Sequence, residues 1–356
     1  MRTFTKTFFL GAAASFFGLL ALAEILLRMT VPTGFWYRHF DLSGDMTSLP
    51  EIRDRIRYGA PQKDRILLLG DSVLGASALM EHRIPDARQK TLRSVLRGLL
   101  GDRPTLSLGS DGLLLTDIEG LSAEFSATPP GEILLLLNFR MFSKEFAGGP
   151  KALSRQFLLG DLPEDIQKRL ASDRAPGEEA RLSDALYDGL CGHWFLFRET
   201  QMAKTLWYYP SQQDFFQRQL EKVVPANEVL SEIVEASLKQ KVASYYQAHT
   251  WDPKGLPFTC LRQVLDQWSA AHIPVRVVLT PQNPPFLGSY LDKPSFSKNR
   301  KALAAFMKPY LKKGITYQDW ADRYPPSSFL DHCHMTPEGN RRYAGDLVTV
   351  LSGRAR

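Results

Sequence analysis

The stretch that most constrains the fold is Arg65–Ser77, where a short aliphatic run ends at a polar turn. The residues Ile66-Leu67-Leu68-Leu69 are continuously apolar, which is typical of a strand buried on both faces of a parallel sheet. The run stops at Gly70-Asp71-Ser72. Ligands of open α/β sheets bind outside the carboxyl ends of the strands. Ser72 is therefore a candidate nucleophile, although an ordinary turn would also explain these residues.

A second polar motif, Asp331-His332-Cys333-His334, lies near the C terminus. An aspartate three residues before a histidine lets one short loop supply both side chains, so that the carboxylate holds the imidazole while its other nitrogen faces a hydroxyl. Thr336-Pro337-Glu338 then predicts a helix that continues to about Leu351, because proline suits the first helical position. The chain thus offers a hydroxyl, an imidazole and a carboxylate for nucleophilic catalysis.

Together the two motifs resemble those of the SGNH (GDSL) family of serine esterases and acyltransferases. The resemblance implies that Ser72 is the nucleophile, that His334 is its general base and that Asp331 orients the base. His332 is the rival base, but only His334 stands three residues after Asp331. The resemblance also implies a flavodoxin-like, three-layer α/β/α fold with a five-stranded parallel sheet.

The same resemblance implies an oxyanion hole with donors from three places: the Ser72 amide, a glycine after the second strand and an asparagine after the third. Gly112 matches the glycine position better than Gly109. Asn138 follows the third strand, but Leu137-Asn138-Phe139-Arg140 departs from the usual Gly-x-Asn-Asp of the family. Asn138 is therefore either a donor or a cap of the strand end.

Four further features lie near the proposed site. The first has a structural interpretation, and each of the other three has two. We expect Asp71 to bond nearby amides behind the serine. Arg140 either meets an anionic substrate or forms a surface ion pair. The residues Thr280–Pro285 either line a substrate pocket or form a plain exit turn. Cys333 is either a second nucleophile or a small filler side chain.

The remaining strand and helix patterns alternate along the chain. This alternation predicts right-handed crossovers and a parallel sheet. Besides the strand before Ser72, we expect strands at 104–108, 132–138, 274–280 and 315–320, and helices at 86–100, 260–272 and 297–313.

The strand pattern disappears between the third and fourth strands, where charged helical patterns alternate with aromatic clusters. These aromatic residues either form a small core of their own or line a substrate groove. The predicted organisation is a membrane anchor at 1–28, a linker at 29–63, the first part of the α/β domain at 64–141, a helical insertion at 142–255 and the second part of the α/β domain at 256–356.

The N-terminal segment carries Arg2 and Lys6 ahead of a mostly apolar run from Thr7 to Leu27, which has about the 20 residues that a membrane-spanning helix needs. Ala21-Leu22-Ala23 fits a cleavage site of a signal peptide, but the apolar run continues beyond it and favours an uncleaved anchor. Basic residues before the span predict a cytoplasmic N terminus and a catalytic domain in the periplasm or outside the cell.

Charge and cysteine content exclude several classes of protein. The net charge of +6 is spread along 356 residues without a dense basic block, so no nucleic-acid role is predicted. The spacing of Cys191, Cys260 and Cys333 is not that of a zinc site. Because the glycines form no nucleotide loop and no acidic cluster is evident, we expect no cofactor and no metal.

The resulting hypothesis is an extracytoplasmic serine esterase or O-acyltransferase acting on ester-linked acyl groups of a cell-envelope polysaccharide or polymer. Anchored chains of this kind look like two groups, the acetyltransferases of cell-surface polysaccharides and the D-alanyl transfer protein of teichoic-acid modification. The resemblance implies an acyl donor, a carbohydrate or polyol acceptor, a multispanning membrane acyl exporter as partner, and contact with the lipid bilayer. The alternative is a non-catalytic scaffold that binds envelope polymer or the exporter.

Overall fold

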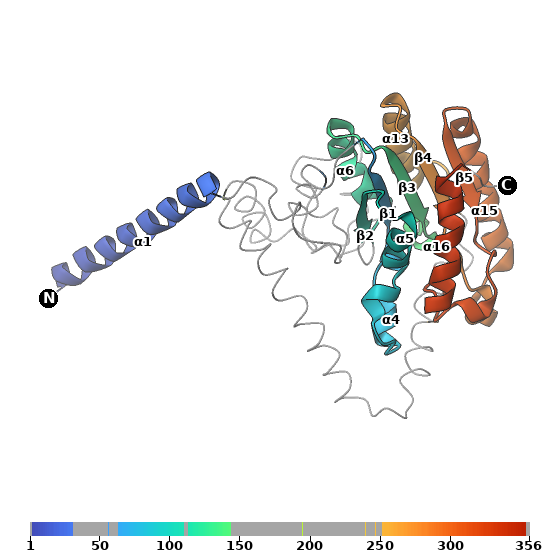
Figure 1. The fold of residues 1–356 in the computed structure, drawn as a ribbon, viewed down its shortest axis with the longest axis horizontal. Coiled ribbons are helices and arrows are strands. Elements are labelled where there is room, and N and C mark those ends of the chain that lie inside the picture. Colours follow the sequence, from blue (N-terminus) through green and yellow to red (C-terminus); the bar gives the residue numbers. More distant parts are fainter. Residues whose placement is uncertain are drawn as a thin grey trace.

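The computed structural model describes residues 2–30, 56, 63–109, 113–143, 194, 239, 246 and 251–353. Its centre is a parallel sheet of five strands in the order β2-β1-β3-β4-β5 (Figure 1), which confirms the predicted α/β class. This is the order of flavodoxin-like sheets. The strands are β1 (Ile66–Gly70), β2 (Thr105–Gly109), β3 (Glu132–Leu137), β4 (Val275–Leu279) and β5 (Ile315–Asp319).

The register of the sheet brings the strand ends to one edge. Gly70 at the end of β1 pairs with Gly109 at the end of β2, and Leu137 at the end of β3 pairs with Leu279 at the end of β4. Because all five strands are parallel, the residues that follow them emerge on the same side. The register therefore explains why residues that follow different strands can form one site at the carboxyl edge of the sheet.

Helices cover both faces of the sheet, as a three-layer arrangement requires. Alternate residues of β3 enter two separate cores: Ile133, Leu135 and Leu137 face one, and Leu134 and Leu136 face the other. Burial on both faces explains why β3 is continuously apolar. The first core is formed with α6 (Leu115–Ala127), α13 (Leu256–Ala270) and α15 (Lys293–Leu311), and the second with α5 (Leu92–Leu100) and α16 (Pro337–Leu351).

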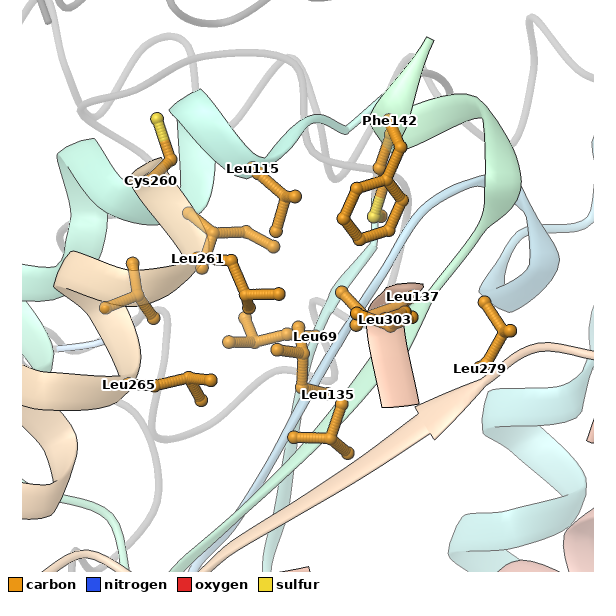
Figure 2. Packing of buried hydrophobic residues seen from close by; sticks show 14 of the residues in the cluster. Leu69, Leu115, Leu135, Leu137, Phe142, Cys260, Leu261, Leu265, Leu279 and Leu303 are labelled. Carbon is orange, nitrogen blue, oxygen red and sulfur yellow. The ribbon is translucent and has the colours of Figure 1, made fainter. Parts of the chain in front are cut away.

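Leucines dominate the first core. Figure 2 shows Leu135 and Leu137 of β3 beside Leu261 of α13 and Leu303 of α15. All four side chains are fully buried. Each such side chain contributes about 1.5–3 kcal/mol through burial, so this packing holds the strands in the register that shapes the edge.

Several helix boundaries differ from those expected, because capping residues determine them. The helix expected at 86–100 begins only at Leu92, where the Thr91 side chain accepts the Ser94 amide; Asp86 is in the left-handed region and cannot continue a helix. The helix expected at 297–313 begins at Lys293, because Asp292 caps it through Ser295. The other described elements are α1 (Arg2–Thr30), η1 (Ser72–Leu74), α4 (Ser77–Glu81), η2 (Ala87–Lys90), η3 (Phe139–Phe142), α14 (Pro284–Leu287), η4 (Gly288–Tyr290) and η5 (Pro326–Ser328), where η marks a 3-10 turn.

The N-terminal segment forms α1, and Glu24 pairs with Arg28 at 2.6 Å near its end. Among the helices of the described residues, none combines the length and the apolar character needed to cross a bilayer. The predicted transmembrane helix is therefore not supported. Most of the predicted linker at 29–63 and of the predicted helical insertion at 142–255 lies outside the described residues.

Candidate active site

The turn after β1 presents Ser72 at the carboxyl edge of the sheet. The buried carboxylate of Asp71 accepts the Val73 amide at 3.2 Å, and the backbone oxygens of Asp71 and Ser72 accept the amides of Leu74 and Gly75. These bonds fold Ser72–Leu74 into the 3-10 turn η1. The predicted structural role of Asp71 is thus observed, and the turn leaves the Ser72 amide beside its own hydroxyl.

The loop before α16 is folded around the carboxylate of Asp331. Its Oδ1 accepts the backbone amides of Cys333 at 2.9 Å and His334 at 2.8 Å, which bends the four residues into a tight turn. The Leu330 amide closes the turn by donating to the His334 carbonyl oxygen. Thr336 then caps α16 by accepting the Gly339 amide at 3.0 Å. The hydrogen bonds within this short loop therefore fix the backbone position from which the His334 side chain extends.

The structure brings the three predicted catalytic side chains together. His334 Nε2 lies 2.9 Å from Ser72 Oγ, and His334 Nδ1 lies 2.7 Å from Asp331 Oδ2. Ser72 is buried, with 8% of its surface exposed, and the His334 side chain is 17% exposed, so the imidazole is the more exposed member of the pair. The rival His332 instead directs its Nε2 toward Cys333 Sγ, at 3.3 Å.

Charge interactions within this chain of hydrogen bonds shift the pKa values of Asp331 and His334. Burial alone would raise the pKa of Asp331, but the charges of His334 and His332 and the hydrogen bonds from His334 hold it well below its usual range. Burial alone would lower the pKa of His334, but the Asp331 carboxylate and the Cys333 sulfur raise it well above its ordinary value. The arrangement therefore stabilises an ionised carboxylate beside an imidazolium.

Asn138 follows β3 at the same edge and is buried. Its Oδ1 accepts the Arg140 amide at 3.4 Å, so the residue caps η3. Its Nδ2 donates to Cys333 Sγ at 3.6 Å, which directs the amide group toward the loop that carries His334. An asparagine amide has two N–H donors, so capping and an oxyanion role are compatible.

Of the two glycines considered for the oxyanion hole, Gly109 belongs to the described residues and Gly112 does not. Gly109 ends β2, and a Cβ atom at this position would come within 2.9 Å of the Leu74 Cβ. The absence of a side chain at Gly109 therefore makes room for the turn that carries Ser72.

Arg140 forms an ion pair behind the candidate nucleophile. Its Nη2 lies 2.7 Å from Asp71 Oδ2; the Asp71 side chain is fully buried, and the Arg140 side chain is 18% exposed. The pair joins the turn after β1 to the turn after β3. A surface ion pair or a substrate contact was expected for Arg140, but the partner is a fully buried carboxylate. The sequence did not identify this partner, because nothing local links two residues 69 positions apart.

The segment after β4 supports the loop that carries His334. The Asn283 amide donates to the His332 carbonyl oxygen at 2.7 Å, and Asn283 Nδ2 donates to the Asp331 carbonyl oxygen at 2.9 Å. The neighbouring Gln282 bonds the hydroxyl of the buried Tyr246. The stretch Thr280–Pro285 is thus more than an exit turn, and sequence reasoning missed the positioning role of Asn283.

Cys333 is a buried free thiol in the middle of the site. Besides the contacts with His332 and Asn138, its Sγ lies 3.8 Å from His334 Nδ1. Burial alone would raise the pKa of this thiol, but the charges of His332 and His334 and their hydrogen bonds lower it to about 7. Asp331, His332, Cys333 and His334 each also offer an atom that could bind a metal ion, and these four atoms lie within 4.8 Å of one another.

Comparison with known proteins does not assign the chain to a family. No protein-family model matches it, and no curated protein matches it significantly. The geometry around Ser72 and the two motifs that supply Ser72, Asp331 and His334 are therefore the basis for a function.

Proposed function

We propose that the chain is a serine esterase or O-acyltransferase of SGNH type that works through an acyl-enzyme on Ser72. The observation that carries this proposal is the continuous chain of hydrogen bonds from Ser72 Oγ through the His334 ring to the Asp331 carboxylate, at 2.9 Å and 2.7 Å. A serine hydroxyl is a weak nucleophile at neutral pH and needs a base within hydrogen-bond reach. His334 is such a base, because its Nε2 contacts Ser72 Oγ and its Nδ1 contacts the Asp331 carboxylate.

In the proposed reaction, His334 Nε2 takes the proton of Ser72 as Oγ attacks the ester carbonyl carbon. Asp331 holds the proton on Nδ1 and stabilises the imidazolium that forms. The negative charge on the carbonyl oxygen is stabilised by the Ser72 amide and by the second N–H of Asn138, both at the same edge of the sheet. The bond to the leaving alcohol then breaks, and His334 gives that alcohol its proton.

The acyl-enzyme is resolved by the same groups in reverse order. His334 deprotonates an incoming hydroxyl, which attacks the acyl carbon and releases Ser72. Water makes the protein a hydrolase, whereas a carbohydrate or polyol hydroxyl makes it a transferase. The proposed substrates are ester-linked acyl groups of a cell-envelope polymer, by analogy with the membrane-anchored SGNH proteins that the chain resembles.

The proposed setting of the reaction comes from the sequence. Arg2 and Lys6 precede an apolar segment, which favours an extracytoplasmic location of the α/β domain. A transferase in this setting draws its acyl group from a donor outside the cytoplasm, and a multispanning membrane acyl exporter is the proposed partner. Purifying the full chain in detergent with candidate exporters and testing for co-elution examines this part.

An active-site probe tests the proposed nucleophile. We expect a fluorophosphonate to label the full-length protein, because the probe reacts with activated serines. Ser72→Ala should abolish the labelling, and Ser352→Ala, at the exposed end of α16, should retain it. Equal labelling of Ser72→Ala and the parent protein would contradict the proposal, and so would an unlabelled parent protein; the second result favours the non-catalytic scaffold.

Mass spectrometry distinguishes the donors and the two outcomes of the reaction. The protein is incubated with candidate acyl donors, and the mass added to the peptide that contains Ser72 identifies the acyl group. Adding glycans or polyols then tests transfer. Acylated acceptor indicates a transferase, whereas free acid at the same rate with every acceptor indicates a hydrolase.

A further inference from the structure

The two residues between Asp331 and His334 are buried within the site, although the proposed reaction uses neither. His332 and Cys333 are 7% and 4% exposed. Cys333 Sγ lies 3.3 Å from His332 Nε2 and 3.8 Å from His334 Nδ1, so a sulfur lies between two imidazole nitrogens. Asp331 adds a carboxylate, and the four ligand atoms lie within 4.8 Å of one another. Thiolate, imidazole and carboxylate are the ligands that Zn²⁺ takes in proteins.

The spacing of these atoms fits a tetrahedral zinc ion. With Zn–S about 2.3 Å and Zn–N about 2.0–2.1 Å, the sulfur and a nitrogen of a tetrahedral site are about 3.5 Å apart. The two observed sulfur–nitrogen distances, 3.3 Å and 3.8 Å, lie on either side of that value. On binding, the ligand atoms that are up to 4.8 Å apart must approach, and His334 Nδ1 and Asp331 Oδ2, which are 2.7 Å apart, must separate.

The second nitrogen of His332 provides an independent observation. His332 Nδ1 is buried and makes no hydrogen bond to any residue within the described ranges. It lies 3.5 Å from Asp331 Oδ1, at the long end of an ion pair. Metal-ligating histidines donate their other ring N–H to a carboxylate, which fixes the tautomer that presents the ligating nitrogen. In this structure His332 Nδ1 lacks that hydrogen bond within the described part of the chain, and Nε2 is the ring nitrogen that faces Cys333 Sγ at 3.3 Å.

We propose that Cys333, His332 and His334, together with the Asp331 carboxylate, form a zinc site that overlaps the reaction centre. The ligands are Cys333 Sγ, His332 Nε2, His334 Nδ1 and Asp331 Oδ2. The Cys333 thiol loses its proton to solvent on binding, because thiolate is the form that ligates. The proton on His334 Nδ1 moves to Nε2, which frees Asp331 Oδ2 from its hydrogen bond and lets it reach the metal.

The consequence of this site for catalysis rests on the proposed function, whereas the binding itself does not. With zinc on Nδ1, the protonated Nε2 of His334 donates a hydrogen bond to Ser72 Oγ and cannot accept its proton. Zn²⁺ therefore inhibits the esterase reversibly, and removal of the metal by a chelator restores activity. No metal was expected from the sequence, because the three cysteines lack zinc-site spacing and no acidic cluster is evident; in the proposed site the histidines on both sides of Cys333 complete the ligand set.

Cobalt spectroscopy of the full chain with Ser72→Ala tests the site without any need for activity. Co²⁺ is added to this chelator-treated protein under reducing conditions. We expect one equivalent of Co²⁺ to produce a thiolate-to-cobalt charge-transfer band in the near ultraviolet and the intense visible bands of a tetrahedral ion. Zn²⁺ should then displace Co²⁺ and remove both sets of bands.

Three variants in the same background identify the ligands. Cys333→Ser should eliminate the charge-transfer band, His332→Gln should weaken Co²⁺ binding at least tenfold, and Cys260→Ser, in the first core, should leave both unchanged. Circular dichroism verifies that each variant is folded. The proposal is overturned if the Ser72→Ala protein gives no charge-transfer band at a micromolar excess of Co²⁺, or if the band survives when Cys333→Ser is added to it. A normal cobalt spectrum in Ser72→Ala, together with no fluorophosphonate labelling of the chelator-treated protein that keeps Ser72, would refute the proposed function and leave the metal site intact.

Discussion

His334 Nε2 lies 2.9 Å from Ser72 Oγ, although 262 positions separate the two residues in the chain. The parallel register brings Ser72 to the carboxyl edge of the sheet, and two hydrogen bonds from Asn283, after β4, hold the loop that carries His334 at the same edge. The contact therefore depends on three separate segments. Substitutions of the residues around the His334 imidazole test whether this contact takes part in catalysis.

Removing the charge of Asp331 should disable the reaction without unfolding the loop. In Asp331→Asn the side-chain oxygen can still accept the amides of Cys333 and His334, but the imidazole loses the partner that fixes its tautomer. We expect kcat for a small ester to fall about 10⁴-fold. Asp266→Asn makes the same change at an exposed ion pair with Lys313 and should retain the parent rate. A loss below tenfold in Asp331→Asn would show that the carboxylate is not part of the reaction.

The pH dependence of the rate should report the raised pKa of His334. Only the neutral imidazole can accept the Ser72 proton, so kcat/KM rises with pH as His334 deprotonates. Because burial is outweighed by the Asp331 carboxylate and the Cys333 sulfur, the midpoint of this rise should lie above 6.5. In Asp331→Asn the midpoint should move to lower pH. Equal midpoints in the two proteins would indicate that another group controls the rise.

Asn138 should matter for the rate more than for substrate binding. An oxyanion donor acts on charge that develops only in the transition state, so Asn138→Ala should lower kcat about 10²–10³-fold and change KM little. Steady-state kinetics with a soluble ester measure both constants. A variant that raises KM and keeps kcat would show that Asn138 serves ground-state binding.

The ion pair between Arg140 and Asp71 should contribute strongly to stability, because Asp71 is fully buried. Arg140→Met leaves that carboxylate without its charged partner, and we expect the free energy of unfolding to fall by about 3 kcal/mol. Arg323→Met removes an exposed pair with Asp346 and should cost less than about 1 kcal/mol. Urea unfolding of the three proteins compares them. Similar losses in both variants would mean that the buried pair has no special role.

Much of the sheet and the three central side chains could be predicted from local patterns. Continuous apolar runs mark strands that are buried on both faces, and β3 enters both cores as such a run requires. Ser72 and the Asp331–His334 spacing were recognisable because each motif is short and local. Their convergence was predicted through a family resemblance, not through any physical rule that relates residues so far apart.

The supporting contacts could not be predicted because each joins distant segments. Arg140 meets Asp71 across 69 positions, and Asn283 holds the Asp331 carbonyl across 48. Each of these polar residues has many potential partners in the sequence, and only the register selects one. Cys333 is a similar case: its position in the motif was evident, but the inward direction of its sulfur depends on how Asp331 folds the loop.

Two glycines of α16 should respond in opposite ways to alanine, because only one lies against another segment. At Gly339 a Cβ would overlap the Ser328 carbonyl oxygen and press on the Met335 Cβ at 3.1 Å, so Gly339→Ala should destabilise the fold by about 2 kcal/mol. At Gly345 a Cβ would meet no heavy atom of the described residues within 4 Å, so Gly345→Ala should stabilise the fold by about 1 kcal/mol through helix propensity. Thermal unfolding measures both changes. Because Ser328 also accepts the Thr336 amide at the end of the loop that carries His334, Gly339→Ala should lower the rate of the proposed esterase reaction as well, whereas Gly345→Ala should keep it. A destabilised Gly345→Ala would place an unseen neighbour against that face of the helix.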